Sequence, residues 1–179
     1  EVVLSENKIS SQIQQYLVNM RTLQANFSQL NDTGDVMTGN LFLKKPGKIR
    51  FSYDRPHNLQ IVSKQRAILI FDPKGSGSGP LTYPLSSTPL SFLIRNEFVA
   101  LMNEHSESFE LDDKIFIKIQ NPQYRLSIEF KKKPVSLVGW EFENQMGEIV
   151  SISLNNIKTN DYMSDEIFKT EKDYERFKK

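Results

Sequence analysis

The side chains that could perform catalysis are few and scattered in this 179-residue chain. Its two histidines, His57 and His105, belong to no metal-binding spacing such as H-E-x-x-H. The chain contains no cysteine, which removes thiolate zinc sites, catalytic thiols and disulfides. Glu141 and Glu143 have the two-residue spacing that would place a pair of acid–base carboxylates on one strand face. Trp140 and Phe142 then occupy the opposite face, so we interpret the two carboxylates as lying on the solvated side of a strand.

A glycine- and serine-rich segment and two basic clusters also lack a clear chemical role. Residues 75–80 do not fit a phosphate-binding loop, because no lysine follows at the required place and residue 80 is proline. The basic clusters at 44–50 and 131–133 lie beside predicted hairpins. With 23 Lys+Arg against 22 Asp+Glu, the formal net charge is only +1, which argues against a nucleic-acid partner. We interpret these lysines as charges that protect turns and sheet edges from aggregation. Docking to an acidic protein or to a lipid surface is a further interpretation.

Alternation of apolar and polar side chains predicts nine or ten strands, separated by turn-forming residues such as Pro46-Gly47 and Asp72-Pro73. Short strands with regular turn signals indicate an antiparallel sheet or barrel. The predicted strands are 23–27, 41–43, 49–53, 59–62, 67–71, 109–111, 115–119, 124–130, 140–143 and 150–154.

Only two segments are apolar enough to cover such a sheet. Ile9, Ile13, Tyr16, Met20 and Leu23 recur at three- and four-residue spacing, which predicts a helix over 9–23. Residues 88–102 form a second, very apolar segment with predicted helical structure. The charged tail, 164–179, is predicted to be a turn or a short helix. No run of about 18 apolar residues is present, so we expect no membrane-spanning helix.

The length predicts a single domain spanning residues 1–179. A large one-sided antiparallel sheet must cover its apolar face, and it tends to curl. Two short helical segments would be a thin filling for its concave side. The pattern is therefore compatible with an open half-barrel that has a hydrophobic cavity under helices, and equally with a two-sheet sandwich that fills its own core.

Several segments resemble the LolA family of outer-membrane lipoprotein carrier proteins, and they occur in the family's order along essentially the whole chain. The segment YPLSSTPLSFLI, residues 83–94, is similar to the second helix of alphaproteobacterial members. The others are LQANFSQ (23–29), GNLFLKKPGKIRFSYDRP (39–56), IVSKQRAILIFDP (61–73) and the closing hairpin WEFENQMGEIVSISLNNIKTN (140–160).

This resemblance implies a mainly β fold with some α structure. A single curved antiparallel sheet would form an unclosed half-barrel, with helices as a lid over an apolar cavity. It also implies a non-enzymatic periplasmic carrier without cofactor or metal, present as a mature chain after signal peptide removal. Such a carrier accepts lipoproteins from an inner-membrane ABC exporter, binds their acyl chains and passes them to an outer-membrane acceptor. We expect the protein to be a monomer.

The resemblance and the strand pattern together suggest which residues would bind cargo. Many family members carry an arginine directly before the proline of the 39–56 segment, where it bonds to the lid backbone. This chain has Lys45 there, which keeps the charge but loses the planar fork of arginine. We expect Lys45 to contact the 88–102 segment. The expected cavity lining is Leu41, Leu43, Ile49, Phe51, Leu126, Ile128, Trp140 and Phe142, and the expected lid residues are Ile13, Met20, Leu90, Phe92 and Leu93.

Two other functions are compatible with these patterns. A related half-barrel could act as a sensor that binds lipid or lipoprotein and regulates a partner, although no second domain is evident. A lipid or cell-wall hydrolase would need a nucleophile–base pair, and no motif places one. The membrane-anchored acceptor is a poorer match, because its anchor is an N-terminal cysteine and this chain has none.

Overall fold

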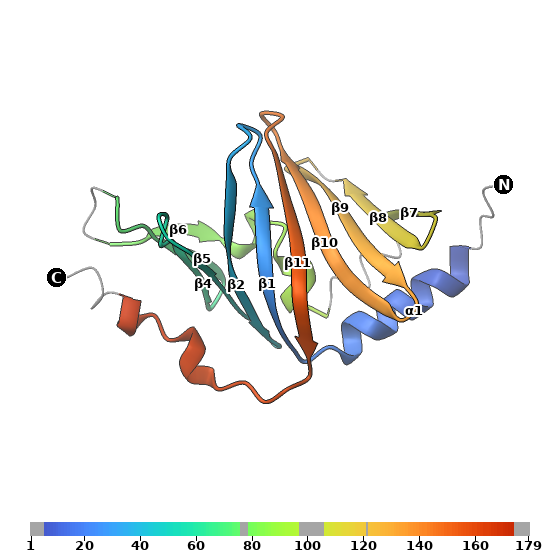
Figure 1. The fold of residues 1–179 in the computed structure, drawn as a ribbon, viewed down its shortest axis with the longest axis horizontal. Helices are drawn as coiled ribbons and strands as arrows, with labels where there is room; N and C mark the ends of the chain where they lie inside the picture. The colour runs from blue at the N-terminus through green and yellow to red at the C-terminus, as the bar shows by residue number, and fades with distance from the viewer. Residues whose placement is uncertain (1–5, 76–78, 97–105, 121, 174–179) are drawn as a thin grey trace.

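The computed structural model describes residues 6–75, 79–96, 106–120 and 122–173. Eleven antiparallel strands form one sheet in the order β6-β5-β4-β3-β2-β1-β11-β10-β9-β8-β7, so β6 and β7 are its two edges and the sheet is not closed (Figure 1). This confirms the half-barrel over the sandwich. The strands are β1 Thr22–Leu30, β2 Val36–Lys44, β3 Lys48–Tyr53, β4 Gln60–Lys64, β5 Ala67–Phe71, β6 Leu81–Pro84, β7 Ser106–Leu111, β8 Lys114–Gln120, β9 Tyr124–Lys132, β10 Val135–Asn144 and β11 Ile149–Thr159.

Ten of these strands correspond to those predicted from alternation, and β6 was not predicted. Its four residues are all exposed and its last residue is Pro84, so it is short and lacks the alternation of buried and exposed side chains by which the other strands were predicted. Elsewhere the pattern holds well. In β8, for example, Ile115, Ile117 and Ile119 are buried while the residues between them are more exposed.

Two glycines allow neighbouring strands to approach closely in the middle of the sheet. A Cβ atom at Gly39 of β2 would lie 2.1 Å from the Ser52 carbonyl oxygen, and one at Gly139 of β10 would lie 2.1 Å from that of Ile152. Gly139 also adjoins a break in register between β9 and β10. Such bulges bend and twist a strand, so this position contributes to the curvature of the sheet.

The first helix, α1 (Glu6–Asn19), is shorter than the predicted helix over 9–23. Leu23 belongs to β1, and Met20 lies between the two elements. The cause is Asn160, at the end of β11. Its Oδ1 accepts a hydrogen bond from the Arg21 N–H at 2.7 Å, and its Nδ2 donates to the Asn19 carbonyl oxygen at 3.2 Å. These bonds satisfy the end of the helix and direct the chain into the sheet.

The described part of the second cover, residues 88–96, is only partly α-helical. Within the described part of 88–102, α-helix is confined to α2 (Ser91–Ile94), which follows a 3₁₀ turn, η1 (Leu85–Ser87). Residues 97–102 lie outside the described residues. In the chain that the structure describes, no helix combines the length and the apolar character needed to cross a membrane.

Residues 161–173, which we call the C-terminal strap, cover the outer face of the sheet near β3 and β4 (Figure 1). They include the 3₁₀ turn η2 (Asp165–Phe168), which contacts β3. Arg50 of β3 projects outward between the inward-facing Ile49 and Phe51, and it is only 7% exposed. Its Nη2 contacts Asp173 Oδ1 at 2.5 Å, and its Nη1 donates to the Ile167 carbonyl oxygen at 3.1 Å. The tail is thus an ordered part of the fold up to Asp173.

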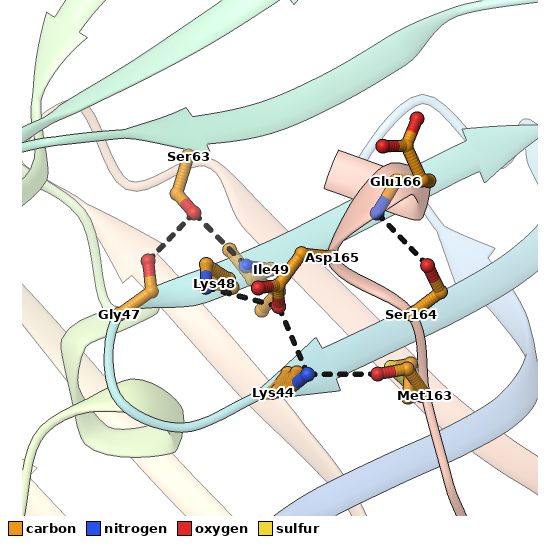
Figure 2. A network of polar contacts seen from close by, with 9 residues as sticks. All are labelled: Lys44, Gly47, Lys48, Ile49, Ser63, Met163, Ser164, Asp165 and Glu166. Atoms are coloured by element: carbon orange, nitrogen blue, oxygen red, sulfur yellow. Dashed lines mark hydrogen bonds and ion pairs between the residues drawn. The ribbon is translucent and has the colours of Figure 1, made fainter. Parts of the chain in front are cut away.

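Figure 2 shows a second, more exposed attachment of the strap. Lys44 Nζ lies 2.9 Å from Asp165 Oδ1 and donates to the Met163 carbonyl oxygen at 2.8 Å, while Lys48 Nζ lies 3.1 Å from the same carboxylate oxygen. Hydrogen bonds from Lys44 and then Lys48 hold the pKa of the Asp165 carboxyl below its usual value. The Ser164 hydroxyl accepts a bond from the Glu166 N–H and caps η2. The strap therefore attaches to both strands of the β2–β3 hairpin.

Candidate functional site: the covered apolar face

One face of the sheet is apolar over its inner strands, from β5 to β8 in the sheet order, and α1 and α2 pack on it. The edge strand β7 is polar on this face, because it places Ser106, Ser108 and Glu110 opposite the isoleucines of β8. Cross-strand register brings the apolar side chains together: Leu41 lies opposite Phe51, and Leu43 lies opposite Ile49. On the other half of the sheet, Ile128 lies opposite Trp140, and Leu126 lies opposite Phe142. All eight expected cavity residues therefore lie on the same face. Seven of them are buried: Leu41, Leu43, Ile49, Phe51, Leu126, Ile128 and Trp140.

Trp140 joins the sheet to the second cover. Its ring lies 5.5 Å from the Phe92 ring of α2 and 6.4 Å from the Phe51 ring of β3, measured between centroids, and both pairs are edge-on. Edge-to-face pairs add roughly 1 kcal/mol to the burial of the rings. Phe92 and Leu93 are buried among the core side chains. The cover thus occupies the apolar surface that an apolar ligand would need.

The first cover is anchored on β9 and β10 through Tyr16. Its ring packs edge-on against Phe130 with a centroid separation of 6.1 Å, and its hydroxyl accepts a hydrogen bond from the Leu137 N–H at 3.1 Å. Burial raises the pKa of the Tyr16 hydroxyl, and the Leu137 bond partly opposes that change. The hydroxyl is therefore neutral at physiological pH. This polar bond helps to fix α1 on β10 within a largely apolar contact.

Lys45 lies where the two covers meet the end of β2. Its ammonium group donates to the Leu17 carbonyl oxygen of α1 and, at 3.3 Å, to Asn96 Oδ1 just beyond α2. The backbone supports the same junction, since the Gly47 N–H donates to the Ile94 carbonyl oxygen at 3.2 Å. Burial lowers the pKa of the Lys45 ammonium, so closing the covers over this charge has a desolvation cost. Lys45 thus joins both covers to the sheet, but the desolvation cost limits the strength of that attachment.

The expected lid residues occupy three different positions. Ile13 lies in α1 and is fully buried, whereas Met20 lies after the helix and is buried at the junction with β1. Phe92 and Leu93 are buried in α2, and Leu90 precedes that helix and is half-buried, as Phe142 is on the sheet. The sequence analysis omitted Leu17, Ile94 and Asn96 from the lid. Leu17 follows Ile13 by four residues, so helical periodicity could have identified it, but no local signal marks Asn96.

The other candidate groups from the sequence lie elsewhere. Glu141 is exposed and Glu143 is partly exposed on the outer face, opposite Trp140, as the strand pattern predicted. Glu143 lies 3.8 Å from Arg125 and Glu141 accepts a 3.4 Å hydrogen bond from Ser151, so both are part of a solvated polar surface. His57 lies in the turn between β3 and β4, and His105 is outside the described residues. Among the described residues, no three His, Asp or Glu side chains are arranged to hold a metal ion.

An open antiparallel half-barrel whose apolar face lies under helical covers is the architecture of a class of proteins that bind apolar ligands. The model of the family described as outer membrane lipoprotein carrier protein LolA matches residues 18–171. The chain belongs to the LolA family.

Known proteins agree with this assignment. An outer-membrane lipoprotein carrier protein of Methylococcus capsulatus is 25% identical over 184 residues, covering 92% of this chain and 84% of that protein. One of Helicobacter hepaticus is 24% identical over 155 residues, covering 84% and 78%. A crystal structure of a LolA superfamily protein from Nitrosomonas europaea superposes with a TM-score of 0.52 at 13% identity, covering 95% of this chain and all of that one. A DUF1329 family protein from Desulfovibrio piger gives a TM-score of 0.53 at 11% identity, with coverage of 92% and 96%.

Proposed function

We propose that this protein is a periplasmic carrier that binds the acyl chains of lipoproteins between its sheet and its two covers. It accepts them from an inner-membrane lipoprotein-releasing ABC exporter and delivers them to an outer-membrane acceptor. It acts as a monomer by binding alone, without making or breaking covalent bonds. The observation that carries this proposal is the apolar face of the inner strands, which within the described residues is covered by α1 and α2.

The energetics of such a site suit transport rather than storage. Each buried CH₂ group contributes about 0.8 kcal/mol, so one long acyl chain would gain roughly 10 kcal/mol before ordering costs are subtracted. In the empty protein, however, residues such as Ile13 and Phe92 already occupy the apolar face. Cargo must displace them, and their lost burial offsets part of the gain. The resulting affinity is moderate enough to permit release to an acceptor.

Ligand titration tests this function directly. Purified protein should bind the apolar probe bis-ANS saturably under native conditions, and a triacylated lipopeptide should displace the probe. The same peptide without acyl chains is the control, and it should not compete. Absence of saturable probe binding, or equal competition by both peptides, would contradict an acyl-binding site on this face. Native mass spectrometry of the protein isolated from periplasm should show bound lipoprotein.

A further inference from the structure

A hollow of about 780 Å³ lies outside the covered face, where α1 ends, β1 begins and β11 ends. These three elements converge at the lower edge of the molecule in Figure 1. The hollow combines basic side chains with exposed apolar ones. The residues that carry this character are Val18, Arg21, Lys44, Lys45, Asp161 and Tyr162.

The floor of the hollow is held by backbone and amide contacts, so its shape does not depend on the charged side chains. Asn160 bonds to Asn19 and Arg21 through its side chain, and the Asn160 N–H donates to the Thr22 carbonyl oxygen at 2.9 Å. The Lys45 N–H donates to the Arg21 carbonyl oxygen at 2.8 Å. A substitution of a charged side chain at the rim is therefore expected to leave the hollow in place.

The charge of the hollow is positive although the whole chain is nearly neutral. Three cations, Arg21, Lys44 and Lys45, line it together with a single carboxylate, Asp161. Lys44 is paired with Asp165 of the strap, and Lys45 is engaged by the two covers. The Arg21 guanidinium has no ion-pair partner among the described residues and is available to a ligand. The carbonyl oxygens of Leu17 and Asn19, at the end of α1, are already hydrogen-bonded, so the negative end of this helix is partly compensated.

The rim carries the apolar component. Tyr162 is 93% exposed and Val18 is 49% exposed, and both line the same hollow as the cations. A tyrosine beside basic side chains is typical of surfaces that lie at the headgroup level of a membrane, where the ring enters the interface and the cations meet phosphates. A free phosphate ion would use the cations but would gain nothing from an exposed aromatic ring.

We propose that this hollow is a docking site for the surface of an anionic phospholipid membrane, with Arg21 contacting headgroup phosphates, Lys44 and Lys45 adding positive charge beside it, and Tyr162 entering the interface. The proposal rests on the proposed carrier function, since a carrier must meet membranes at both ends of its path. Membrane docking would also weaken the attachment of the covers. Lys45 lines the same hollow and holds both covers, so phosphates at the docking site would compete with Leu17 and Asn96 for its ammonium group.

Vesicle cosedimentation tests docking without any cargo, so its failure is distinguishable from a failure of acyl binding. The full chain should cosediment with vesicles of equimolar phosphatidylglycerol and phosphatidylcholine at low salt, much less at high salt, and not with phosphatidylcholine alone. Added inorganic phosphate, at an ionic strength matched with sodium chloride, should not release it beyond the effect of the salt. Equal binding to both kinds of vesicle, or no binding to either, would overturn the proposal.

Variants locate the contact on the molecule. Arg21→Gln should lower the partition coefficient about five-fold, which corresponds to ~1 kcal/mol for one basic side chain at an anionic surface. Tyr162→Ser should lower it as well, and Asp161→Asn should raise it. Arg125→Gln removes the same charge from the outer face of β9 and is the matched control, expected to bind like the unmodified protein. If Arg21→Gln and Arg125→Gln reduce binding equally, the attraction is that of the whole protein and the hollow is not a docking site.

Discussion

Lys45 combines two opposing contributions in one side chain. Its hydrogen bonds to Leu17 and Asn96 favour closed covers, whereas burial of its charge disfavours them, as the lowered pKa of its ammonium indicates. A charge-assisted hydrogen bond contributes about 1.5–3 kcal/mol when it is well formed, and desolvation removes part of that. The net effect is a modest bias toward the closed arrangement. Such a bias can be overcome by cargo or by a membrane surface.

Replacement of Lys45 should therefore change the rate of transfer. Lys45→Leu removes the contact to both covers and should increase the open fraction about five-fold, on the basis of roughly 1 kcal/mol for the lost bonds. Uptake of lipopeptide should become faster and release slower. Lys45→Arg keeps a donor that can reach the same acceptors and should transfer at a rate close to the original. Stopped-flow measurement of probe displacement provides the rates, and identical rates in all three proteins would show that Lys45 does not hold the covers.

Arg50 and Asp173 form a buried ion pair that attaches the strap to β3, and Asp173 has no exposed surface. Arg50 also contacts Gln60 Oε1 at 2.8 Å through Nη2, so its guanidinium is well satisfied. Arg50→Met would leave the Asp173 carboxylate buried without a counter-charge and should destabilise the protein by about 3–5 kcal/mol.

Lys48→Met is the matched control for Arg50→Met. It removes the exposed ion pair between Lys48 and Asp165 of the same strap, so it should lower the free energy of unfolding by less than about 1 kcal/mol. Urea unfolding measures both free energies. Equal effects of the two substitutions would mean that the buried pair does not secure the strap.

At the scale of the elements, the sequence predicted most strands but misplaced both ends of α1. Alternation marks a strand wherever one face is buried, which is why β8 and β9 were predicted and the fully exposed β6 was not. The end of α1 depends on Asn160, which lies 141 residues beyond Asn19 in the chain. No local pattern can reveal such a contact. The tail was predicted as a turn or a short helix, in agreement with η2, but its attachment to the sheet was not predicted, because that depends on the distant Arg50.

The two covers should move when cargo enters, and a covalent bridge between them tests this. Val18 of α1 and Asn96 beyond α2 are exposed. The Lys45 ammonium group bonds to Asn96 and to Leu17, the neighbour of Val18 in the chain, so both positions lie near this junction. Cysteines at these two positions can be joined by a short bismaleimide, and the chain contains no other cysteine to react. The bridged protein should fail to take up lipopeptide, whereas the same variant before bridging should take it up.

The control for the bridge joins two strands that have no reason to separate. Asn26 of β1 and Asn40 of β2 are exposed and directly opposite in register, so a cysteine pair there can be joined in the same way. This bridged protein should bind lipopeptide normally. Full uptake by the Val18–Asn96 bridged protein would mean that the covers are a fixed part of the core, and the mechanism of cargo entry would then have to be different.

At the scale of the whole molecule, we expect the covers and the acyl chains of the cargo to compete for the same face of the sheet. In the proposed mechanism, either the covers or the acyl chains occupy its apolar face, so the stability of the empty protein and its affinity for cargo are coupled. The apparent dissociation constant equals the intrinsic constant divided by the fraction of molecules that are open. A substitution that weakens the covers should thus strengthen cargo binding, even when it removes an apolar side chain from the site.

Phe92→Ala provides this test, because Phe92 belongs to the covers and packs edge-on against Trp140 of the sheet. Its removal should lower the melting temperature of the empty protein and tighten lipopeptide binding about five-fold or more, given roughly 1 kcal/mol for the ring pair alone. Leu126→Ala removes a buried apolar group from the sheet itself. Leu126 would contact the covers in the empty protein and the acyl chains in the loaded one. This variant should therefore also have a lower melting temperature, but it should bind lipopeptide equally well or more weakly. Calorimetric titration of both variants shows directly whether each substitution strengthens or weakens lipopeptide binding. If Phe92→Ala weakens binding as Leu126→Ala does, Phe92 contacts the cargo instead of competing with it, and the covers do not set the affinity.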